Sequence, residues 1–447
     1  MYLTLKEKLQ LLKRTVSKIE EGTIKFDSEK ENFGFNRLEQ LFPVSDNEIK
    51  GYPCIAYNKP SDPLKFGVKI IPMENKYDTD THPCRLETRL LKDFRRLVLE
   101  NKTPHITFYF ADFQVKNTKK ALVKFPLKAL RHEIYKTSDV LVAEYVSGGS
   151  IEEWLQLEEN VSESQWKYII FSMAWTLMIL HEDSQFMHND FHYGNVLVDT
   201  SIDASSKTIL EYVWKDQNCT FQIRNPGIVP KMWDFEFANS YQSKDETNYN
   251  NCLTTKYENV PHEFNPYFDL HHFLTSLLEL VDLPDSIQEF ILSIYPPEVI
   301  PELEEYNSTT DTSSTTTSED SMVSFCSNDS CSCCFSDSFS DSSEFYYKTD
   351  EESTNSVDSM SSSECSSESS SSNSSNSSNS SSSSTSSNSS SSSEESEVRT
   401  EFLLGGSLLN GTEKKFKLPT PKDVLMHSFF DEYRVNLKNK FKTTFTY

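Results

Sequence analysis

A long serine-rich, acidic stretch constrains more than any other feature what this chain of 447 residues can fold into. Residues 301–400 contain nineteen Asp or Glu and two Lys or Arg, so they carry −17 of the net charge of −25. Serine dominates residues 361–393. Such a composition buries too little apolar surface to offset the entropy lost on ordering the chain. We therefore expect residues 303–400 to form a disordered, low-complexity insertion between two folded segments.

A compact group of polar residues precedes this insertion at residues 188–195, which read HNDFHYGN ahead of an apolar Val-Leu-Val run. Asp190 and Asn195, five positions apart on a loop, suit phosphoryl transfer. The Asp accepts the proton of the attacking hydroxyl, and the Asn holds a magnesium ion on the phosphates. The spacing matches the kinase catalytic loop H-R-D-L-x-x-x-N, with Asn189 for Arg and Phe191 for Leu. The chain therefore resembles eukaryotic-type serine/threonine protein kinases, in the divergent form of large DNA viruses such as iridoviruses.

A lysine and a glutamate lie upstream at distances that fit this resemblance. Lys69 stands inside a short β-branched strand at residues 66–71, where burying a lysine is costly unless it is paired. Glu87 follows 18 positions later in residues 85–94, where Leu and Phe recur at helical spacing. The resemblance implies that Lys69 contacts the nucleotide phosphates and that Glu87 positions it.

Two acidic residues follow the catalytic loop. Asp234 ends an apolar run and precedes Phe, so the resemblance equates it with the magnesium-binding Asp of the Asp-Phe-Gly motif. Glu236 replaces the glycine of that motif and removes its most permissive backbone position. Asp269, 35 residues beyond Asp234, lies near the start of an apolar segment. The resemblance implies that Asp269 anchors the catalytic loop.

The hinge between the two expected lobes also has the pattern of this family. Residues 140–146 form an apolar run that leads into a glycine-containing turn. The resemblance implies that backbone groups of Glu144 and Val146 bond the adenine edge. Ala143 would then stand at the back of the adenine pocket, where its small size predicts an open space. Ser150 corresponds to a ribose contact and is also placed to cap the next helix.

Three departures set this chain apart from the common kinase pattern. The phosphate-binding loop lacks G-x-G-x-x-G, and Gly51 is the one glycine near the expected position. No A-P-E tripeptide ends the activation segment. An insertion at residues 201–227 lengthens the path from Asp190 to Asp234 to 44 residues. Together with His192, these features resemble the haspin branch of protein kinases.

His192 stands where many Ser/Thr kinases have a lysine that stabilises the transferring phosphoryl group. A histidine can do so only when it is protonated or donates a hydrogen bond. The alternative is a structural role in which the ring only bonds a backbone carbonyl. Both interpretations stay open from the sequence.

The expected fold class is α+β, a bilobal protein-kinase-like fold with the Ser-rich insertion in its C-lobe. Residues 4–20 are expected to form a helix with an apolar face from Leu5 to Val16, packed on the small lobe. Residues 419–430 resemble the final helix of protein kinases, so the fold resumes after the insertion. We predict an N-terminal helical extension (1–40), the N-lobe (41–143), the C-lobe (144–302), the insertion (303–400), the completion of the C-lobe (401–435) and a basic tail (436–447).

These residues predict an ATP- and Mg²⁺-dependent protein kinase that transfers the γ-phosphate to Ser/Thr hydroxyls of proteins. The predicted site comprises catalytic Asp190, His192 and Asn195, nucleotide-binding Lys69, Glu87, Gly51, Glu144, Val146 and Ser150, and metal-binding Asn195 and Asp234. Two alternatives stay open. The catalytic motifs also resemble small-molecule kinases of the choline and aminoglycoside type, which lack the closing helix. The altered phosphate loop and Glu236 would suit a pseudokinase scaffold, although a scaffold needs no such set of polar catalytic residues.

The predicted partners are protein substrates, with the chain itself a candidate through its Ser-rich insertion. Nucleic acid and a membrane span are not expected. The basic residues at 438–442 are too few to indicate nucleic-acid binding. The apolar run 169–180 is shorter than the ~20 residues that a membrane span needs. The charged N-terminus and the scattered cysteines predict a reduced, non-secreted protein. The expected location is the cytoplasm or nucleus of an infected host cell, or the virion; the oligomeric state stays open.

Overall fold

The computed structural model describes residues 2–40, 52–59, 61–73, 83–118, 137–158, 160–241, 264–296, 418–434 and 442–447, together with 403–404, 407–408 and 437. All of them belong to one unit, formed by residues 1–329 and 398–447. Segments on both sides of the predicted insertion therefore fold together. The insertion at residues 303–400 and Gly51 lie outside the described residues.

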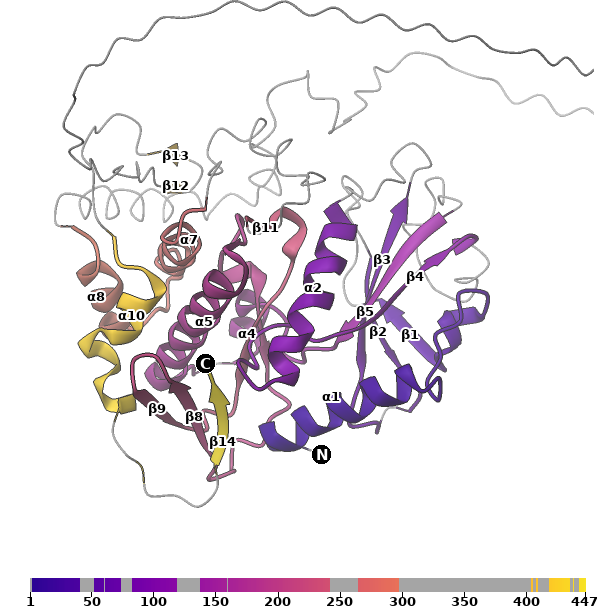
Figure 1. Cartoon of the computed structure of the whole chain (residues 1–447), viewed down its shortest axis with the longest axis horizontal. Coiled ribbons are helices and arrows are strands. Elements are labelled where there is room, and N and C mark those ends of the chain that lie inside the picture. The colour runs from indigo at the N-terminus through magenta and orange to yellow at the C-terminus, as the bar shows by residue number, and fades with distance from the viewer. Residues whose placement is uncertain are drawn as a thin grey trace, which may run out of the picture. The chain divides into compact units, whose positions relative to one another are not determined.

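An antiparallel sheet of five strands forms the first lobe (Figure 1). Its strands, in spatial order, are β1 (Arg37–Gln40), β2 (Tyr52–Tyr57), β3 (Phe66–Met73), β5 (Thr137–Glu144) and β4 (Tyr109–Val115). Strand β3 lies inside the sheet, where Lys69 is opposite Pro53 of β2 and Leu141 of β5. Helix α2 (Pro83–Leu99) buries Leu90 and Phe94, as the helical spacing predicted.

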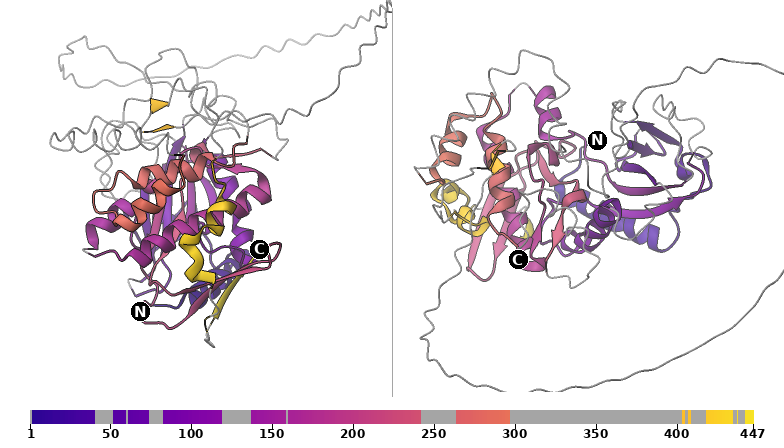
Figure 2. Two further views of the ribbon diagram at one scale, coloured as in Figure 1. Left: turned by 90° about the vertical axis from the view of Figure 1, so that its left-hand side faces the viewer. Right: turned by 90° about the horizontal axis from the view of Figure 1, so that it is seen from above.

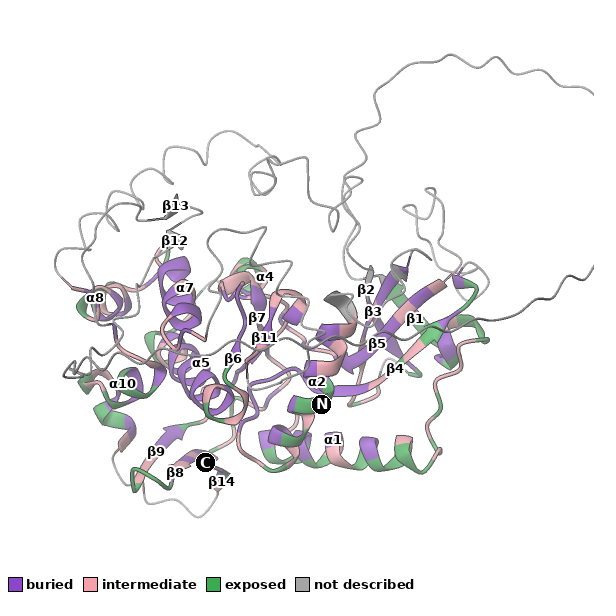
Figure 3. Cartoon of the chain, turned by 45° about the horizontal axis from the view of Figure 1, so that its top comes forward, coloured by how far each residue is buried: buried purple, intermediate pink, exposed green. Residues whose placement is uncertain are grey.

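Helices dominate the second lobe, which Figure 2 shows beside the sheet lobe. They are α4 (Ile151–Leu157), α5 (Glu163–Ser184), α7 (Phe268–Leu277) and α8 (Asp285–Ser293). In α5 every residue from Tyr168 to Leu180 is buried, so this helix is packed on all sides (Figure 3). The sequence had indicated only one apolar face. No helix in the described parts of the chain has the length and apolar character needed to cross a membrane.

Two short antiparallel ladders frame the predicted catalytic loop. Strand β6 (Phe186–Met187) pairs with β11 (Asn239–Ser240), and β7 (Val196–Asp199) pairs with β10 (Val229–Met232). The loop at residues 188–195 connects β6 to β7, and Asp234 follows β10 closely. The ladders therefore hold the loop and the Asp-Phe segment next to each other.

The predicted insertion at residues 201–227 contains a β-hairpin. Strands β8 (Ile209–Trp214) and β9 (Cys219–Arg224) pair antiparallel, and β14 (Lys442–Thr446) adds to β8 in parallel. Within the predicted basic tail (436–447), residues 442–446 form a strand of this sheet. Phe445 on this strand is fully buried and packs near Tyr212, with ring centroids 5.1 Å apart.

The chain returns to the second lobe after the predicted insertion. Helix α10 (Pro421–Met426) begins at a capping box formed by Thr420 and Asp423, and a 3-10 helix follows at Ser428–Arg434. Phe429 stacks on Phe290 of α8 at 4.0 Å between ring centroids. The predicted closing helix is thus present but ends at Met426. Strands β12 (Leu403–Leu404) and β13 (Ser407–Leu408) form a two-residue ladder before it.

Helix α1 (Leu5–Glu20) contacts both lobes, not the small lobe alone. A capping box of Thr4 and Glu7 starts it, and its apolar face is buried as predicted. Glu20 near its end lies 3.5 Å from Arg95 of α2, while Leu3 before its start bridges Ile202 in the second lobe. The helix therefore crosses the boundary between the lobes.

Candidate active site

A lysine between two carboxylates forms the centre of the candidate site. Lys69 Nζ lies 2.8 Å from Glu87 Oε2 and 3.1 Å from Asp234 Oδ1. Strand β3 fixes the lysine, helix α2 carries Glu87, and the turn after β10 carries Asp234. The fold therefore brings together three residues that the sequence had singled out from three separate segments.

Burial and the neighbouring charges shift the pKa values of Lys69 and Glu87 in opposite directions. Burial alone would lower the pKa of Lys69, but the carboxylates of Asp234, Glu87 and Glu236 outweigh it and raise that pKa well above its ordinary value. Burial raises the pKa of Glu87 to about 7, against the pull of Lys69. The second oxygen of Glu87, Oε1, accepts no hydrogen bond from the described residues. Lys69 therefore stays a cation at neutral pH.

Asp269 anchors the backbone of the predicted catalytic loop. Its carboxylate accepts the amide of His188 at 2.6 Å and the amide of Asn189 at 2.9 Å. Burial raises the pKa of Asp269 to about 7, although the two amides favour its ionised form. Asn189 has a φ of 64°, a left-handed conformation that Asn tolerates better than most residues. Its side chain donates to the carbonyl of Phe237, which ties the loop to the segment after Asp234.

Asp190 and Asn195 face each other across the loop. Asn195 Nδ2 donates to the Asp190 carbonyl at 2.8 Å and to Asp190 Oδ2 at 3.2 Å. Because the nitrogen of the amide is used in this way, its oxygen is the atom left for another ligand. The Asp190 side chain is 38% exposed, which leaves its carboxylate accessible to a substrate hydroxyl.

The Asp-Phe segment is tied to the loop through Trp233. The Trp233 amide donates to the carbonyl of Asn195 at 3.1 Å, and Trp233 O is 2.8 Å from His188 Nε2. Asp234 itself has the left-handed backbone, with φ 61° and ψ 67°. Glu236 lies in a 3-10 helix, Phe235–Phe237, and has no positive φ. A glycine is therefore not required at position 236 in this conformation.

His192 presents one ring nitrogen to Asp190. Its Nδ1 accepts a hydrogen bond from the Gly194 amide at 3.1 Å, so Nε2 carries the proton of the neutral ring. Nε2 lies 3.8 Å from Asp190 Oδ1. A Cβ on Gly194 would come within 2.7 Å of the ring, so this approach needs glycine. The structural alternative for His192 was a hydrogen bond to a backbone carbonyl. The ring instead accepts a hydrogen bond from a backbone amide, that of Gly194.

The hinge presents backbone groups and one helix cap. The Glu144 amide donates to the Phe108 carbonyl at 2.8 Å, so this amide is not available to a ligand. The Val146 amide donates to no acceptor in the described part of the chain. Ser150 caps α4 through a capping box with Glu153, as its position predicted. Its hydroxyl accepts in that cap and keeps its own proton for donation.

A buried cluster of four charges lies behind the hinge and was not predicted. Glu144 pairs with Lys8 of α1 and with Lys231 of β10, each at 2.9 Å. Lys8 also bonds Asp199 at the end of β7. The side chains of Glu144 and Asp199 are 0% exposed, and those of Lys8 and Lys231 are 7% and 2% exposed. Two cations and two carboxylates therefore balance each other inside the fold.

Comparisons with known proteins agree with this geometry. The model of the ABC1 atypical kinase-like domain matches residues 131–222, which include the hinge and the catalytic loop. The chain contains a kinase-like domain. A protein of Acanthamoeba polyphaga mimivirus, provisionally named a serine/threonine-protein kinase, is 26% identical over 280 residues, covering 56% of this chain and 59% of the relative.

Two further relatives match shorter parts of the kinase-like domain. An uncharacterized protein of Invertebrate iridescent virus 3 is 26% identical over 160 residues, covering 35% of this chain and 28% of that protein. A Dictyostelium discoideum protein, also provisionally named a serine/threonine-protein kinase, is 31% identical over 148 residues, covering 32% of this chain and 11% of that protein. The chain thus spans less than two thirds of the length of each relative, and its relatives include proteins of two large DNA viruses.

The donor set of the kinase-like domain fits a metal that arrives with its substrate. Among the described residues, no group of three His, Cys, Asp or Glu side chains could hold a metal ion by itself. Mg²⁺ commonly takes one or two protein oxygens and completes its shell with waters and substrate phosphates. The carboxylate of Asp234 and the amide oxygen of Asn195 are ligands of that kind.

The structure leaves one predicted contact undescribed and adds three charged residues. Gly51 lies outside the described residues, so its place near the site stays a prediction. Lys8, Asp199 and Lys231 were missed. One signal was present: Lys8 interrupts the apolar face of α1, three residues after Leu5, and a lysine at such a position indicates a buried partner.

Proposed function

We propose that this chain is an ATP- and Mg²⁺-dependent protein kinase that phosphorylates Ser/Thr hydroxyls. The observation that carries the proposal is the position of Lys69 between Glu87 and Asp234, beside a loop that presents Asp190 and Asn195. Phosphoryl transfer demands little covalent chemistry from the protein. It demands positioned cations, a metal and a group that orients the hydroxyl; this arrangement offers the cation of Lys69, oxygen ligands for a metal in Asp234 and Asn195, and the carboxylate of Asp190.

Each residue has a proposed role. Asp190 orients the hydroxyl of the substrate and accepts its proton, and His192 donates from Nε2 toward the transferring group. Asn195 and Asp234 hold Mg²⁺. Lys69, oriented by Glu87, neutralises phosphate charge. The Glu144 carbonyl and the Val146 amide bond adenine, Ser150 contacts the ribose, and Gly51 belongs to the loop over the phosphates.

The described segment at residues 418–434 favours a protein kinase over a small-molecule kinase. Its helix α10 packs on α5, and Phe430 lies 5.7 Å from Phe171 between ring centroids. Choline and aminoglycoside kinases, which the catalytic motifs also resemble, lack a closing segment of this kind. We extend the proposal to protein substrates in an infected host cell, which the viral relatives support. The serines of the chain's own insertion are candidate acceptors.

The test is phosphate transfer from Mg²⁺-ATP to casein by the purified full chain. Asp190→Asn should reduce transfer at least 10²-fold, because the hydroxyl loses its proton acceptor. Asp216→Asn, in the exposed turn between β8 and β9, is the matched control and should act as the unchanged chain. ATP binding without transfer to any protein would favour a small-molecule kinase, with choline the first acceptor to try. Failure to bind ATP would leave a pseudokinase scaffold.

A further inference from the structure

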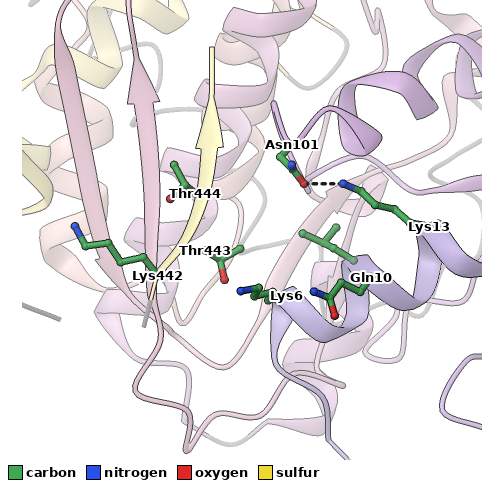
Figure 4. Close-up of a pocket in the computed structure, with 8 residues that line it drawn as sticks. Lys6, Gln10, Lys13, Asn101, Lys442, Thr443 and Thr444 are labelled. Carbon is green, nitrogen blue, oxygen red and sulfur yellow. Dashed lines mark hydrogen bonds between the residues drawn. The ribbon is translucent and has the colours of Figure 1, made fainter. Parts of the chain in front are cut away.

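A pocket separate from the candidate active site lies between α1 and β14. Its volume is about 290 Å³, and Figure 4 shows the residues that line it. They are Lys6, Leu9, Gln10, Lys13, Asn101, Lys442, Thr443 and Thr444. None of them belongs to the set proposed for ATP, Mg²⁺ or the hydroxyl substrate. The pocket therefore needs its own explanation.

The pocket carries positive charge that the described residues do not neutralise. Lys6 and Lys13 stand two turns apart on α1, and neither forms an ion pair with a described residue. Lys13 Nζ bonds the neutral amide oxygen of Asn101 at 3.1 Å (Figure 4). The nearby acid Glu7 is engaged in the helix cap with Thr4.

The outer side of β14 has its own carboxylate. Lys442 Nζ lies 2.7 Å from Glu211 Oε1, and the Thr444 hydroxyl donates to Glu211 Oε2 at 3.0 Å. Glu211 therefore pairs with the Lys442 ammonium group and the Thr444 hydroxyl, which face away from α1. Lys6 and Lys13 on α1 have no carboxylate partner among the residues that the structure describes.

Thr443 supplies a second, independent observation. It is 7% exposed, and its hydroxyl is buried without a hydrogen-bond partner among the described residues. Figure 4 shows this hydroxyl directed toward the same space as the Lys6 ammonium group. A buried hydroxyl is normally hydrogen-bonded, so an unpaired one in a polar pocket indicates a missing ligand.

We propose that this pocket binds a phosphate monoester. Two ammonium groups match the charge of −1.5 to −2 that a phosphate monoester carries near pH 7, and three oxygens accept the available donors. The donors are Lys6, Lys13, the Thr443 hydroxyl and the amide nitrogen of Gln10. A single carboxylate would leave part of the positive charge and some donors unsatisfied. Binding at this place would join α1 to the strand β14.

The first experiment measures binding of inorganic phosphate to the full chain by isothermal titration calorimetry, without nucleotide. Lys6→Gln with Lys13→Gln should weaken binding at least 10-fold. Thr443→Val, which keeps shape and charge, should weaken it several-fold. Lys18→Gln, an exposed lysine on the same helix outside the pocket, should leave it unchanged. Equal binding by all four proteins, or no binding by the unchanged chain, overturns the proposal.

A second series separates this pocket from the nucleotide site and identifies the source of the phosphate. Lys69→Met should leave phosphate binding intact; loss of binding in that variant alone would assign the phosphate to the nucleotide site and overturn the proposal. A phosphoserine peptide that binds more tightly than free phosphate, and loses that advantage in Lys6→Gln/Lys13→Gln, supports a phosphoprotein ligand. Equal affinity for both shows that the pocket recognises the phosphate group alone, which supports a phosphate-binding pocket but overturns a specific phosphoprotein ligand. Neither result depends on kinase activity, so failure here and failure of the proposed function are distinguishable.

Discussion

Single residues decide the charge state of the candidate active site. The Lys69 side chain is only 15% exposed yet stays cationic, because two carboxylates lie within 3.1 Å of its Nζ. Glu87 touches it from α2, and Asp234 touches it from the other lobe. Lys69 therefore contacts one carboxylate from each of these two segments, and its orientation depends on both contacts.

Glu87→Gln tests this dependence. The amide can still bond Lys69 but no longer carries charge, so we expect kcat/KM for ATP to fall about 10²-fold. The free energy of unfolding at pH 7 should hold or rise, because burial raises the pKa of Glu87 to about 7 and so disfavours its ionised form in the fold, while Lys69 keeps Asp234 as a partner. Steady-state kinetics and urea unfolding measure the two quantities. Glu152→Gln, exposed on α4, is the control, and equal kinetics of both variants would contradict the role of Glu87.

Local spacing was sufficient to single out residues that the fold brings close together. Lys69, Glu87, Asp190, Asn195 and Asp234 each stand in a short pattern whose residue types are dictated by the chemistry. The contacts of Lys8 follow from no such pattern. Lys8 and Asp199 are 191 positions apart in the sequence, and no local pattern around either residue indicates that the two are in contact. Such pairs become visible only once the fold has placed α1 against the hinge.

At the scale of elements, α1 acts as a support for the hinge. Its apolar face could be predicted from periodicity, but its partners could not, because periodicity gives a face and not what covers it. Lys8 contacts Glu144 at the end of β5 and Asp199 at the end of β7. Coulombic attraction of these two carboxylates raises the pKa of Lys8 above its ordinary value although burial opposes it, so the lysine is charged in the fold.

Lys8→Met is expected to destabilise the fold by about 3–5 kcal/mol, because it leaves Asp199 as an uncompensated buried charge. Urea unfolding followed by circular dichroism measures the loss. Lys18→Met on the exposed side of α1 is the matched control and should change the free energy of unfolding by less than about 0.5 kcal/mol. A similar small change for Lys8→Met would show that α1 does not support the hinge electrostatically.

At the scale of the whole molecule, His271 joins the two parts of the chain that flank the predicted insertion. Its Nδ1 is 3.0 Å from the Tyr295 hydroxyl, and its Nε2 is 3.0 Å from the Pro419 carbonyl. A neutral His271 ring can make both hydrogen bonds, because Nε2–H donates to the Pro419 carbonyl and Nδ1 accepts from the Tyr295 hydroxyl. Burial lowers the pKa of His271 to about 4.

Burial of His271 makes stability depend on pH, and the hydrogen bond to the Pro419 carbonyl only partly offsets that effect on its pKa. The unfolded chain binds a proton on His271 near pH 6.5 and the folded chain only near pH 4, so the stabilisation is complete above 6.5 and is lost as pH falls toward 4. The loss is about 1.4 kcal/mol per pH unit, or about 3 kcal/mol over that window. His271→Gln should remove this part of the slope. Denaturant unfolding at pH 7, 6, 5 and 4 checks it, and parallel slopes for both proteins would refute it.

Replacing residues 303–400 by a flexible linker of about 20 residues should preserve the fold. The residues that flank the insertion pack together through His271, so the loop contributes mainly its closure entropy. Shortening it from 98 to about 20 residues should raise the free energy of unfolding by about 1.4 kcal/mol. Thermal unfolding of both proteins measures this, and a large loss of stability would show that the insertion contributes to the core. Loss of autophosphorylation with retained casein phosphorylation would locate the acceptor serines in the insertion.

The parallel pairing of β14 with β8 has a consequence for folding during synthesis. Lys442 pairs with Ile209, so the ribosome adds 233 residues after Ile209 before this pair is complete. At ~5–20 residues per second, strand β8 stays without its partner β14 for roughly 10–50 s. During that interval the β8–β9 hairpin exposes an open edge, which is a site for pairing with other chains. The acidic stretch emerges from the ribosome in the same interval, and its negative charge would repel a second nascent chain of the same kind.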